Sequence, residues 1–434
     1  MAVTTTPVLV LVAANSAPAA VKAVAEYTCD GTADQVQINA ALTDVASTGG
    51  LVQLTPGQYN LSASVTVPVS TGVQLRGSGW GTVLQVGSGM AAYGIAFSTT
   101  AGNVTGATLA EFKVDANGSV AGAASGGIYA KGAVQCLIDH VWVTNPYDAG
   151  LWLHEISGGN VGHHNRVRAC LFDATVTVTG HGQGVRMQAS DENWLDHCDF
   201  ESWGGNGSEP YGVKDWAGIN VIDHCNFVGG QEAIRLQDIS GTRITQPMFD
   251  GVGRDAIHIA GSGNTIVGGT FSGGGQSTAG TYSHVNVESG SGNVVTGGTH
   301  STDATAGRLR SFYREQGTAT RNTFGAKDLV VNGALGTGKV ELASGSVTRV
   351  FAVSGYNPVG FGVTQPAVPA STTPVTNTTG VDCMVVVVGG TVTVVTVGGT
   401  ATGLTATPAV VRVPVGQTIA LAYSAAPTWK WFGD

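Results

Sequence analysis

The chain has 434 residues, of which 65 are glycines and only 11% are charged, against roughly 25% charged residues in an ordinary globular domain. Its formal net charge is −9, and its lysines and arginines form no cluster, which excludes a nucleic-acid-binding surface built on basic side chains. No apolar run reaches the roughly 20 residues of a membrane helix, so we do not expect membrane insertion. The many Gly, Val and Thr residues favour a protein built mostly of β-strands.

The N-terminal part, residues 1–50, is expected to contain a strand and a capping helix. The apolar run at 7–17 has no basic segment before it, so we do not expect a secretory signal peptide. Residues 34–46 have the pattern of a short amphipathic helix that covers the open end of the structure following it. The residues expected on its inward face are Val36, Ile38, Ala41 and Leu42.

Residues 51–325 contain a six-residue phrase that recurs at intervals of 22 to 29 residues. The phrases are LAEFKV (109–114), IDHVWV (138–143), VRACLF (167–172), LDHCDF (195–200), IDHCNF (222–227), ITQPMF (244–249), IVGGTF (266–271) and VTGGTH (295–300). The first and last positions are almost always apolar, and the fourth includes a run of cysteines. A period of this length in a Val- and Gly-rich chain indicates a solenoid in which each repeat is one coil.

The third position of the phrase is predicted to be a bend. Strict strand alternation would bury the first, third and fifth positions, so burial of the first, fourth and sixth requires a one-residue kink. A left-handed backbone at this kink suits Gly and is enriched in His, whereas Ala169 and Gln246 fit it poorly. The predicted kink column is Glu111, His140, Ala169, His197, His224, Gln246, Gly268 and Gly297.

The two Asp-His-Cys phrases therefore have a structural interpretation. Asp points outward, His lies at the bend, and Cys170, Cys198 and Cys225 point into the core as small hydrophobic side chains. The six cysteines of the chain contain no CxxC pair. The adjacent His163 and His164 are expected to diverge in a solvated loop. The sequence thus predicts no metal site and no cofactor.

A second strand, with alternating apolar residues, belongs to each coil. These strands are predicted at 150–154, 184–188, 211–216, 233–238, 256–260 and 284–288. Three short strands per coil predict an all-β fold: a right-handed parallel β-helix with an N-terminal capping helix, followed by a small C-terminal β-sandwich. The boundaries predicted for its parts are 1–50 (strand and capping helix), 51–325 (β-helix), 326–358 (connector) and 359–434 (sandwich).

The C-terminal region differs in composition from the repeats. Short Val/Thr strands are separated by Gly-Gly pairs, which are typical of hairpin turns. Its charged residues from position 351 onward are Asp382, Arg412, Lys430 and Asp434. A nearly uncharged domain suits an oligomer interface or a carbohydrate-binding module.

The segment that precedes and begins the predicted stack of coils resembles a known superfamily. Residues 29–78, CDGTADQVQINAALTDVASTGGLVQLTPGQYNLSASVTVPVSTGVQLRGSG, resemble the opening of pectate-lyase-like β-helix proteins. With the VLVAANSAPAAVKAVAEYTCDGTADQ opening and the C-terminal block, the whole chain resembles minor tail and tailspike proteins of phages of actinobacteria. The resemblance implies a homotrimer in the virion tail, outside the cell, in contact with other tail proteins and with a cell-surface polysaccharide.

In proteins of this superfamily, ligands lie along one parallel sheet, so outward residues of the second strand set are the candidates for substrate binding. These are Trp152, His154, Arg186, Gln188, Lys214, Trp216, Arg235, Gln237 and His258. Aromatic, basic and amide side chains stacked about 4.8 Å apart suit a sugar chain, especially an acidic one. The alternative interpretation is a solvated sheet face.

Carboxylates precede several of these strands, and glycoside hydrolysis needs two of them. Asp148, Glu232 and Asp255 are expected to precede their strands by the same number of residues, and Glu209 also lies just before a strand. Glu232 with Asp255 is the best predicted catalytic pair. The alternative is that these residues form turns.

A polysaccharide lyase would instead use a basic residue, with Arg186, Lys214 and Arg235 as candidates, and no dense Asp cluster is present to hold calcium.

Three functions remain open from the sequence, because this fold hosts lyases, hydrolases, adhesins and tailspikes. The first is a phage tail spike or fibre that binds, and in its enzymatic version depolymerises, a host polysaccharide. The second is a secreted bacterial polysaccharide lyase or glycoside hydrolase. The third is a purely structural tail component.

Overall fold

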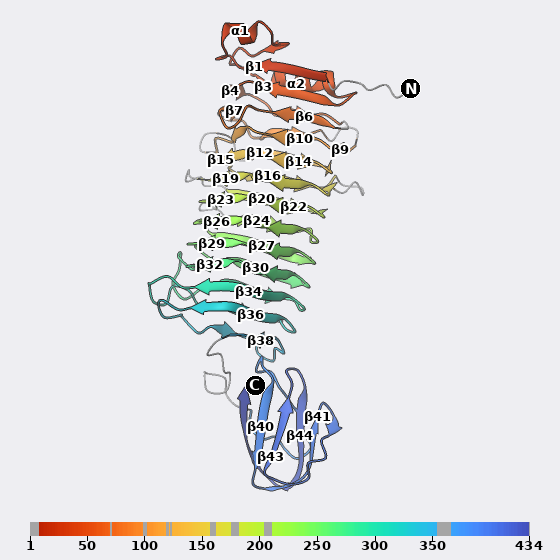
Figure 1. The fold of residues 1–434 in the computed structure, drawn as a ribbon, viewed down its shortest axis with the longest axis vertical. Helices are drawn as coiled ribbons and strands as arrows, with labels where there is room; N and C mark the ends of the chain where they lie inside the picture. The colour runs from red at the N-terminus through yellow and green to blue at the C-terminus, as the bar shows by residue number, and fades with distance from the viewer. Residues whose placement is uncertain are drawn as a thin grey trace.

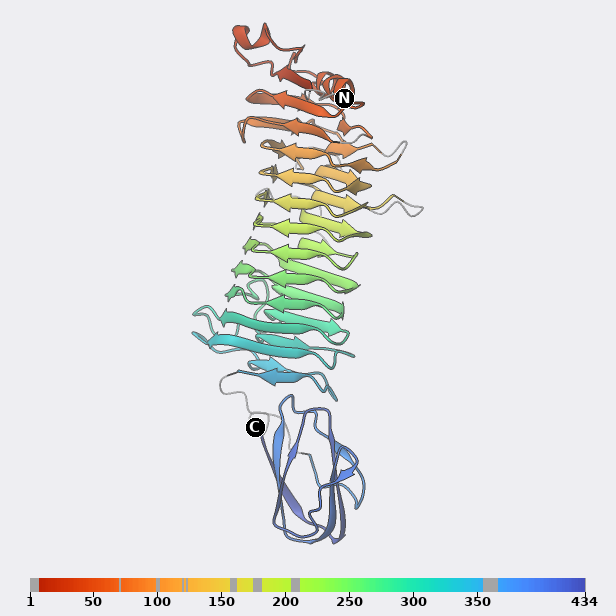
Figure 2. The same ribbon diagram turned by 45° about the vertical axis from the view of Figure 1, so that its right-hand side comes forward.

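The computed structural model describes residues 8–69, 72–98, 102–118, 121, 124–156, 162–174, 182–203, 211–353 and 366–433. These residues form a long stack of coils with a separate β-domain beyond its C-terminal end (Figure 1). From a second direction, the strands of successive coils lie above one another along the whole stack (Figure 2). Within the described residues, no helix has the length and apolar character needed to span a membrane.

Two parallel sheets run along the stack, and the first has two rows of strands. One row is β3 (Gly50–Leu54), β6 (Val73–Arg76), β10 (Thr108–Ala110), β14 (Leu137–Asp139), β18 (Arg166–Arg168), β22 (Trp194–Asp196), β25 (Val221–Asp223), β28 (Arg243–Thr245), β31 (Thr265–Val267), β34 (Val294–Ser301), β36 (Thr323–Val330) and β38 (Arg349–Phe351). The other row is β4 (Gly57–Leu61), β7 (Thr82–Val86), β11 (Lys113–Asp115), β15 (Trp142–Thr144), β19 (Leu171–Asp173), β23 (Asp199–Glu201), β26 (Asn226–Val228), β29 (Met248–Asp250) and β32 (Thr270–Ser272).

The second parallel sheet carries the candidate ligand face. Its strands are β5 (Val65–Val67), β8 (Tyr93–Phe97), β12 (Gly126–Lys131), β16 (Ala149–His154), β20 (Gln183–Gln188), β24 (Tyr211–Asp215), β27 (Glu232–Ser240), β30 (Ile257–Ser262), β33 (Val285–Ser289), β35 (Tyr313–Glu315) and β37 (Val340–Glu341). A third, short parallel sheet contains β9 (Val104–Thr105), β13 (Ala133–Val134), β17 (Gly162–His163) and β21 (Ser190–Asp191). This arrangement confirms the predicted right-handed parallel β-helix.

The predicted bend is present in every phrase. The φ angles are 57° at Glu111, 50° at His140, 49° at Ala169, 51° at His197, 48° at His224, 47° at Gln246, 71° at Gly268 and 78° at Gly297. Ala169 and Gln246, the poor fits, are thus left-handed like the rest. Each lies between strands that pair with the coils before and after it, so the backbone conformation is set by the stack and not by the side chain.

A second left-handed bend lies at another corner of the coil, and the sequence analysis missed it. Its residues are Gln135, His164, Glu192, Ile219, Gly241, Gly263, Gly292 and Arg321, with φ angles between 53° and 79°. In most coils the residue after this bend is a buried Asn, and these side chains form a ladder: Asn165 donates to Asn193 (2.9 Å) and Asn193 to Asn220 (3.1 Å). The ladder satisfies polar backbone and side-chain groups inside the corner.

Thr242 interrupts this ladder, and a carboxylate fills the gap. Asn220 and Thr242 donate to the two oxygens of Asp215 at 3.0 and 2.8 Å. Asp215 is fully buried, and burial raises the pKa of its carboxyl group despite these donors. The ladder then resumes from Asn264 to Asn293 and Asn322, with donor–acceptor distances of 3.1 Å.

The core contains stacks of like side chains. Phe172, Phe200, Phe227, Phe249 and Phe271 follow one another with ring centroids 4.6 to 5.2 Å apart, and His300 continues the stack 4.3 Å from Phe271. Cys170, Cys198 and Cys225 are buried in the neighbouring column, as predicted. Parallel in-register pairing therefore turns one phrase of the sequence into continuous apolar columns.

The N-terminal helix α2 (Gln35–Val45) packs on the first coils, together with β1 (Val8–Ala13) and β2 (Tyr27–Thr28). The short α1 (Ala19–Lys22) lies between β1 and β2 in the chain and has no buried residues. Ile38, Ala41 and Leu42 are buried as expected, but Val36 is 59% exposed, so its predicted inward position is wrong. The buried face starts at Gln35 instead, because Gln35 bonds Ser62 (2.9 Å) and shares a helical face with Ile38 and Leu42.

The C-terminal domain is the expected small β-sandwich. One sheet contains β39 (Val375–Thr376), β44 (Thr418–Ala425), β41 (Thr391–Val397) and β42 (Thr400–Ala401), and the other contains β43 (Ala409–Val413), β40 (Cys383–Val388) and β45 (Thr428–Gly433). Gly398 and Gly399 form the predicted hairpin between β41 and β42. Gly389 and Gly390 do not, because they join strands of different sheets.

The coils continue further than the sequence boundary suggests. Residues 326–358 were expected to be a connector, yet β37 and β38 lie in this range and pair with β35 and β36 of the two parallel sheets.

Substitution at the bend tests whether the stack imposes the left-handed conformation. An L-residue there costs about 1–2 kcal/mol, so Ala169→Gly should raise the free energy of unfolding by roughly 1 kcal/mol despite the higher entropy of Gly. Ala130→Gly, at a buried strand position without positive φ, should lower it by a similar amount. Urea unfolding of both variants measures the difference; destabilisation of equal size in both would show that Ala169 is not strained.

Candidate functional site

The outward face of the second parallel sheet brings most predicted substrate-binding residues into one column. The registered pairs are Trp152 with Arg186, Arg186 with Lys214, Lys214 with Arg235, and Arg235 with His258. His154 pairs with Gln188, and Gln237 with Ala260, in the neighbouring outward column. Glu209 lies outside the described residues.

Four rings form an aromatic platform at the N-terminal end of this column: Tyr93, Tyr129, Trp152 and His154. The ring of Trp152 lies 4.9 Å from that of Tyr129 and stacks on His154 at 4.9 Å. Tyr129 also hydrogen-bonds Nδ1 of His154 (2.8 Å). Burial lowers the pKa of His154. The three rings of Tyr129, Trp152 and His154 are partly exposed, so they offer flat apolar surface to a ligand.

Tyr93 and Tyr129 were not predicted as ligand-binding residues, although the sequence carries a signal for them. The strands YGIAF and GGIYAK have the same alternation as the later strands, and Tyr129 is in register with Trp152.

The basic residues of the column support the aromatic rings and are largely covered. Arg186 donates to Asp148 and Gln183, each at 2.8 Å, and its guanidinium lies 4.6 Å from the Trp152 ring centroid. The ammonium of Lys214 lies 3.5 Å from the Trp216 ring centroid. Arg186 is 7% and Lys214 only 2% exposed. Both therefore act on the aromatic residues by cation–π contacts more than they offer charge to solvent.

Asp148 does not belong with the other two predicted catalytic carboxylates. Ala149, not Asp148, is in register with Gln183, and the pairing continues to Glu232, so the equal spacing assigned to Asp148 is wrong by one residue. The turn before β16 differs in length from the later turns. Asp148 binds Tyr93 (2.7 Å) and Arg186, and β20 and β24 separate its strand from Glu232, about 14 Å at about 4.8 Å per strand.

Glu232, Asp255 and His258 form a buried acid cluster, with one ligand-capable atom of each within 4.8 Å of the others. Asp255 accepts hydrogen bonds from the backbone N–H of Ser283 (2.7 Å) and from Asn286 (2.8 Å). Oε1 of Glu232 accepts no hydrogen bond within the described structure. The two predicted catalytic carboxylates are thus adjacent but differ in hydrogen bonding.

Arg235, His258 and Glu288 cover the acid cluster. Arg235 lies 2.8 Å from Nδ1 of His258, and its other amino group lies 3.3 Å from Glu288. Nε2 of His258 lies 3.0 Å from the same Glu288 carboxylate. A bulge after Ile259 places Ser289, not Glu288, opposite Ala260. Glu232 and Asp255 are only 4% and 3% exposed, so a substrate reaches them only if this layer moves.

Burial determines the protonation chemistry of the cluster. It raises the pKa of Glu232 to about 7, with a further increase from Asp255, against the opposing charges of His258 and Arg235. For His258, burial alone would lower the pKa, but the Asp255 hydrogen bond and the Glu232 charge outweigh it and raise the pKa. Neutral His258 accepts a hydrogen bond from Arg235, whereas the protonated ring donates to Asp255 at 3.3 Å.

The remaining predicted residues lie beside these groups. Gln188, Trp216 and Gln237 are partly exposed along the outward columns.

In the Asp-His-Cys phrases, His197 and His224 pair with their own neighbours Asp196 (2.6 Å) and Asp223 (2.9 Å), while the cysteines are buried. The structural interpretation of these phrases is confirmed.

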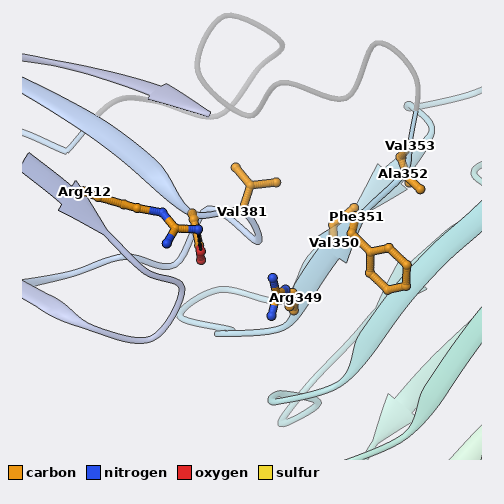
Figure 3. Close-up of a pocket in the computed structure, with 8 residues that line it drawn as sticks. Arg349, Val350, Phe351, Ala352, Val353, Val381 and Arg412 are labelled. Atoms are coloured by element: carbon orange, nitrogen blue, oxygen red, sulfur yellow. Dashed lines mark hydrogen bonds and ion pairs between the residues drawn. The ribbon is translucent and has the colours of Figure 1, made fainter. Parts of the chain in front are cut away.

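A pocket of about 360 Å³ lies away from this face, at the junction of the last coil and the sandwich. Figure 3 shows Arg349 and Val350 of β38 on one side and Val381 and Arg412 of the sandwich on the other. Arg412 forms an ion pair with Asp382 at 2.7 Å. Both members of this ion pair belong to the sandwich, and the residues that line the pocket form no aromatic platform.

Comparison with known proteins shows the fold. No protein-family model and no curated protein sequence matches the chain. The ORF18 protein of Geobacillus virus E2 aligns with a TM-score of 0.54 at 19% identity, over 69% of this chain and 59% of that protein. Bacteriophage phi29 gene product 12, in its pre-mature form, gives 0.56 at 14% identity over 74% and 50% of the two chains.

A sugar-modifying module has the same architecture. The A-module of the mannuronan C-5 epimerase AlgE6 of Azotobacter vinelandii aligns with a TM-score of 0.51 at 14% identity, over 73% of this chain and 94% of the module. The matched region spans 59% of the Geobacillus virus protein and 50% of the phi29 protein. At these identities the likeness confirms the β-helix fold and leaves the activity to the site itself.

The raised pKa of Glu232 predicts a pH-dependent stability. Its ordinary value is 4.5 and its folded value about 7, so the stabilising contribution is complete below pH 4.5 and is lost as the pH rises through 7. Glu232→Gln removes this dependence. Relative to wild type, the variant should gain on the order of 3 kcal/mol of unfolding free energy between pH 4.5 and pH 8. Denaturant unfolding at both pH values measures this; a difference that stays constant with pH would show that Glu232 ionises normally.

Proposed function

We propose that the chain is a phage tail spike or fibre-type receptor-binding protein that holds a host cell-surface polysaccharide on the outward face of the second parallel sheet. The observation that carries this proposal is the aromatic platform continued by the Arg186, Lys214 and Arg235 column. The shared fold with two phage proteins and a mannuronan epimerase module is compatible with it.

The face has the chemistry of a sugar-binding surface. Sugar rings present C–H faces that pack on aromatic rings, and the platform offers Tyr129, Trp152 and His154 for this contact. Gln188 and Gln237 supply amides farther along. Because these residues recur from strand to strand at about 4.8 Å, the bound chain would run parallel to the axis of the stack.

The charges of the face are mostly paired. Arg186 bonds Asp148 at 2.8 Å and Arg235 lies 3.3 Å from Glu288. The sequence favours an acidic glycan, but these ion pairs reduce the positive charge available to it. Recognition would therefore rest on stacking and hydrogen bonds, and affinity should depend only weakly on salt.

Cleavage is the second candidate function, and one observation favours it. Glu232, with its pKa raised to about 7, would be protonated often enough at neutral pH to act as a general acid, with Asp255 as the second carboxylate. One carboxylate oxygen of each residue lies within 4.8 Å of the other, so the two are near enough for the retaining arrangement, in which the carboxyl groups are roughly 5–5.5 Å apart. Hydrolysis requires that Arg235 and His258 swing away from the pair.

The assembly follows from the resemblance to tail proteins, and we propose a homotrimer in the virion tail that contacts other tail proteins. Light scattering distinguishes it from a single chain of 43.9 kDa, which would contradict the trimer.

The test is a screen of actinobacterial surface polysaccharides for retention and cleavage, with a matched pair of tryptophan variants. Trp152→Ala should weaken retention by about tenfold or more, because it removes the centre of the platform. Trp80→Ala, an exposed tryptophan on another face, should bind like wild type. Thermal unfolding of both variants checks that each is folded.

The cleavage readout separates the functions. New reducing ends that disappear in Glu232→Gln would establish a hydrolase, and unsaturated sugar products would establish a lyase. Retention without products would leave a binder. If no glycan is retained, or if both tryptophan variants behave alike, the proposed sugar face is wrong.

A further inference from the structure

The second bend of two adjacent coils brings together three side chains that can bind a metal. His163 ends β17 and His164 follows it at the bend, with a φ of 55°; Glu192 occupies the same bend in the next coil, with a φ of 54°. His163 is in register with Asp191 in β21. Two histidines on one coil therefore lie against two carboxylates on the next.

The expectation that His163 and His164 diverge is wrong. Successive side chains point to opposite faces only in an extended strand, and the left-handed backbone at His164 breaks this alternation. The two rings lie 4.7 Å apart, edge to face. Nε2 of His164 lies 2.9 Å from Oε2 of Glu192. One ligand-capable atom from each of the three residues lies within 4.8 Å of the others.

We propose that His163, His164 and Glu192 form a surface site for a divalent transition-metal ion, of which zinc is the best match. Two imidazoles and one carboxylate are a ligand set that zinc accepts at about 2.0–2.2 Å. A tetrahedral ion separates its ligand atoms by about 3.4 Å at these distances. The His164 and Glu192 side chains are 53% and 45% exposed, so rotation about their side-chain bonds can close the remaining gap, and the fourth position stays open.

The local charges favour a cation. Asp191 adds a second carboxylate one strand away from His163. The nearby arginines have partners of their own: Arg166 lies 4.9 Å from the Trp194 ring, and Arg168 bonds Asp139 at 2.8 Å. No guanidinium therefore has to be displaced from between the ligands.

The buried acid cluster is the other group of metal-ligating side chains in the described structure. It differs because an arginine lies among its ligands. There Arg235 lies 2.8 Å from His258 and 3.5 Å from Glu232, so a positive charge already occupies the neighbourhood that a cation would enter. His197 and His224 stack at 5.0 Å on adjacent coils, but each pairs with its own Asp.

Calorimetric titration of the untagged, chelator-treated protein with zinc chloride tests the proposal. Wild type should bind one ion per chain. His164→Ala and Glu192→Gln should each weaken binding by about tenfold or more, because each removes a ligand. His197→Ala is the matched control, since it removes another exposed histidine (64%, against 53% for His164) at a bend beside a carboxylate, and it should bind like wild type. The side chains of His164, Glu192 and His197 are on the surface, so these three variants should fold.

Three outcomes would overturn the site. The first is absence of stoichiometric binding by wild type. The second is equal loss of affinity in His164→Ala and His197→Ala, which would indicate nonspecific binding by surface histidines. The third is binding that survives in His164→Ala but is lost in His258→Ala, which would place the ion in the buried acid cluster. None of these outcomes depends on whether the protein binds a polysaccharide.

Discussion

The left-handed residue at the bends of each coil is the constraint on which the rest of the structure depends. It lets the chain turn a corner in one residue, so that the strands on both sides stay paired with the coils before and after. Because the side-chain period of a strand is two, a slip of one residue would move a whole row of side chains from the core to the surface. The bends therefore fix which residues form the core and which form the outward face.

Register turns repeated residues into columns with common physical roles. The phenylalanines stack along the core, and the asparagines form a buried ladder whose members bond from coil to coil. Where Thr242 replaces an Asn, Asp215 supplies the missing acceptors. The same rule acts on the outward face of the second sheet, where it aligns the aromatic platform with the basic column. The proposed ligand face is thus a consequence of coil stacking and requires no long loop to build it.

The periodic phrase made the fold predictable, because period, buried columns and the bend all appear in the sequence. Residues whose environment depends on neighbouring coils were harder to predict from the sequence. Ala169 adopts a conformation that its side chain disfavours, since its neighbours hold it there. Asp148 was misplaced because turns differ in length between coils. The ammonium of Lys214 lies beside the rings of Trp216 and Tyr211, and the alternation of the strand alone does not reveal this burial.

The candidate site likewise has features that could be predicted from the sequence and features that could not. The pairing of Glu232 with Asp255 was predictable from strand order, but the layer of Arg235, His258 and Glu288 above it was not, because a bulge in the register brings Glu288 there. This layer covers the two carboxylates, which are 4% and 3% exposed. Binding on the aromatic platform needs no rearrangement, whereas cleavage does.

A structure of the protein with an oligosaccharide fragment of a retained glycan tests the central claim most directly. The account predicts sugar rings packed on Trp152 and Tyr129, with the chain running along the stack toward Arg235. Sugar bound to the C-terminal sandwich or to the first parallel sheet, with the aromatic platform empty, would contradict it.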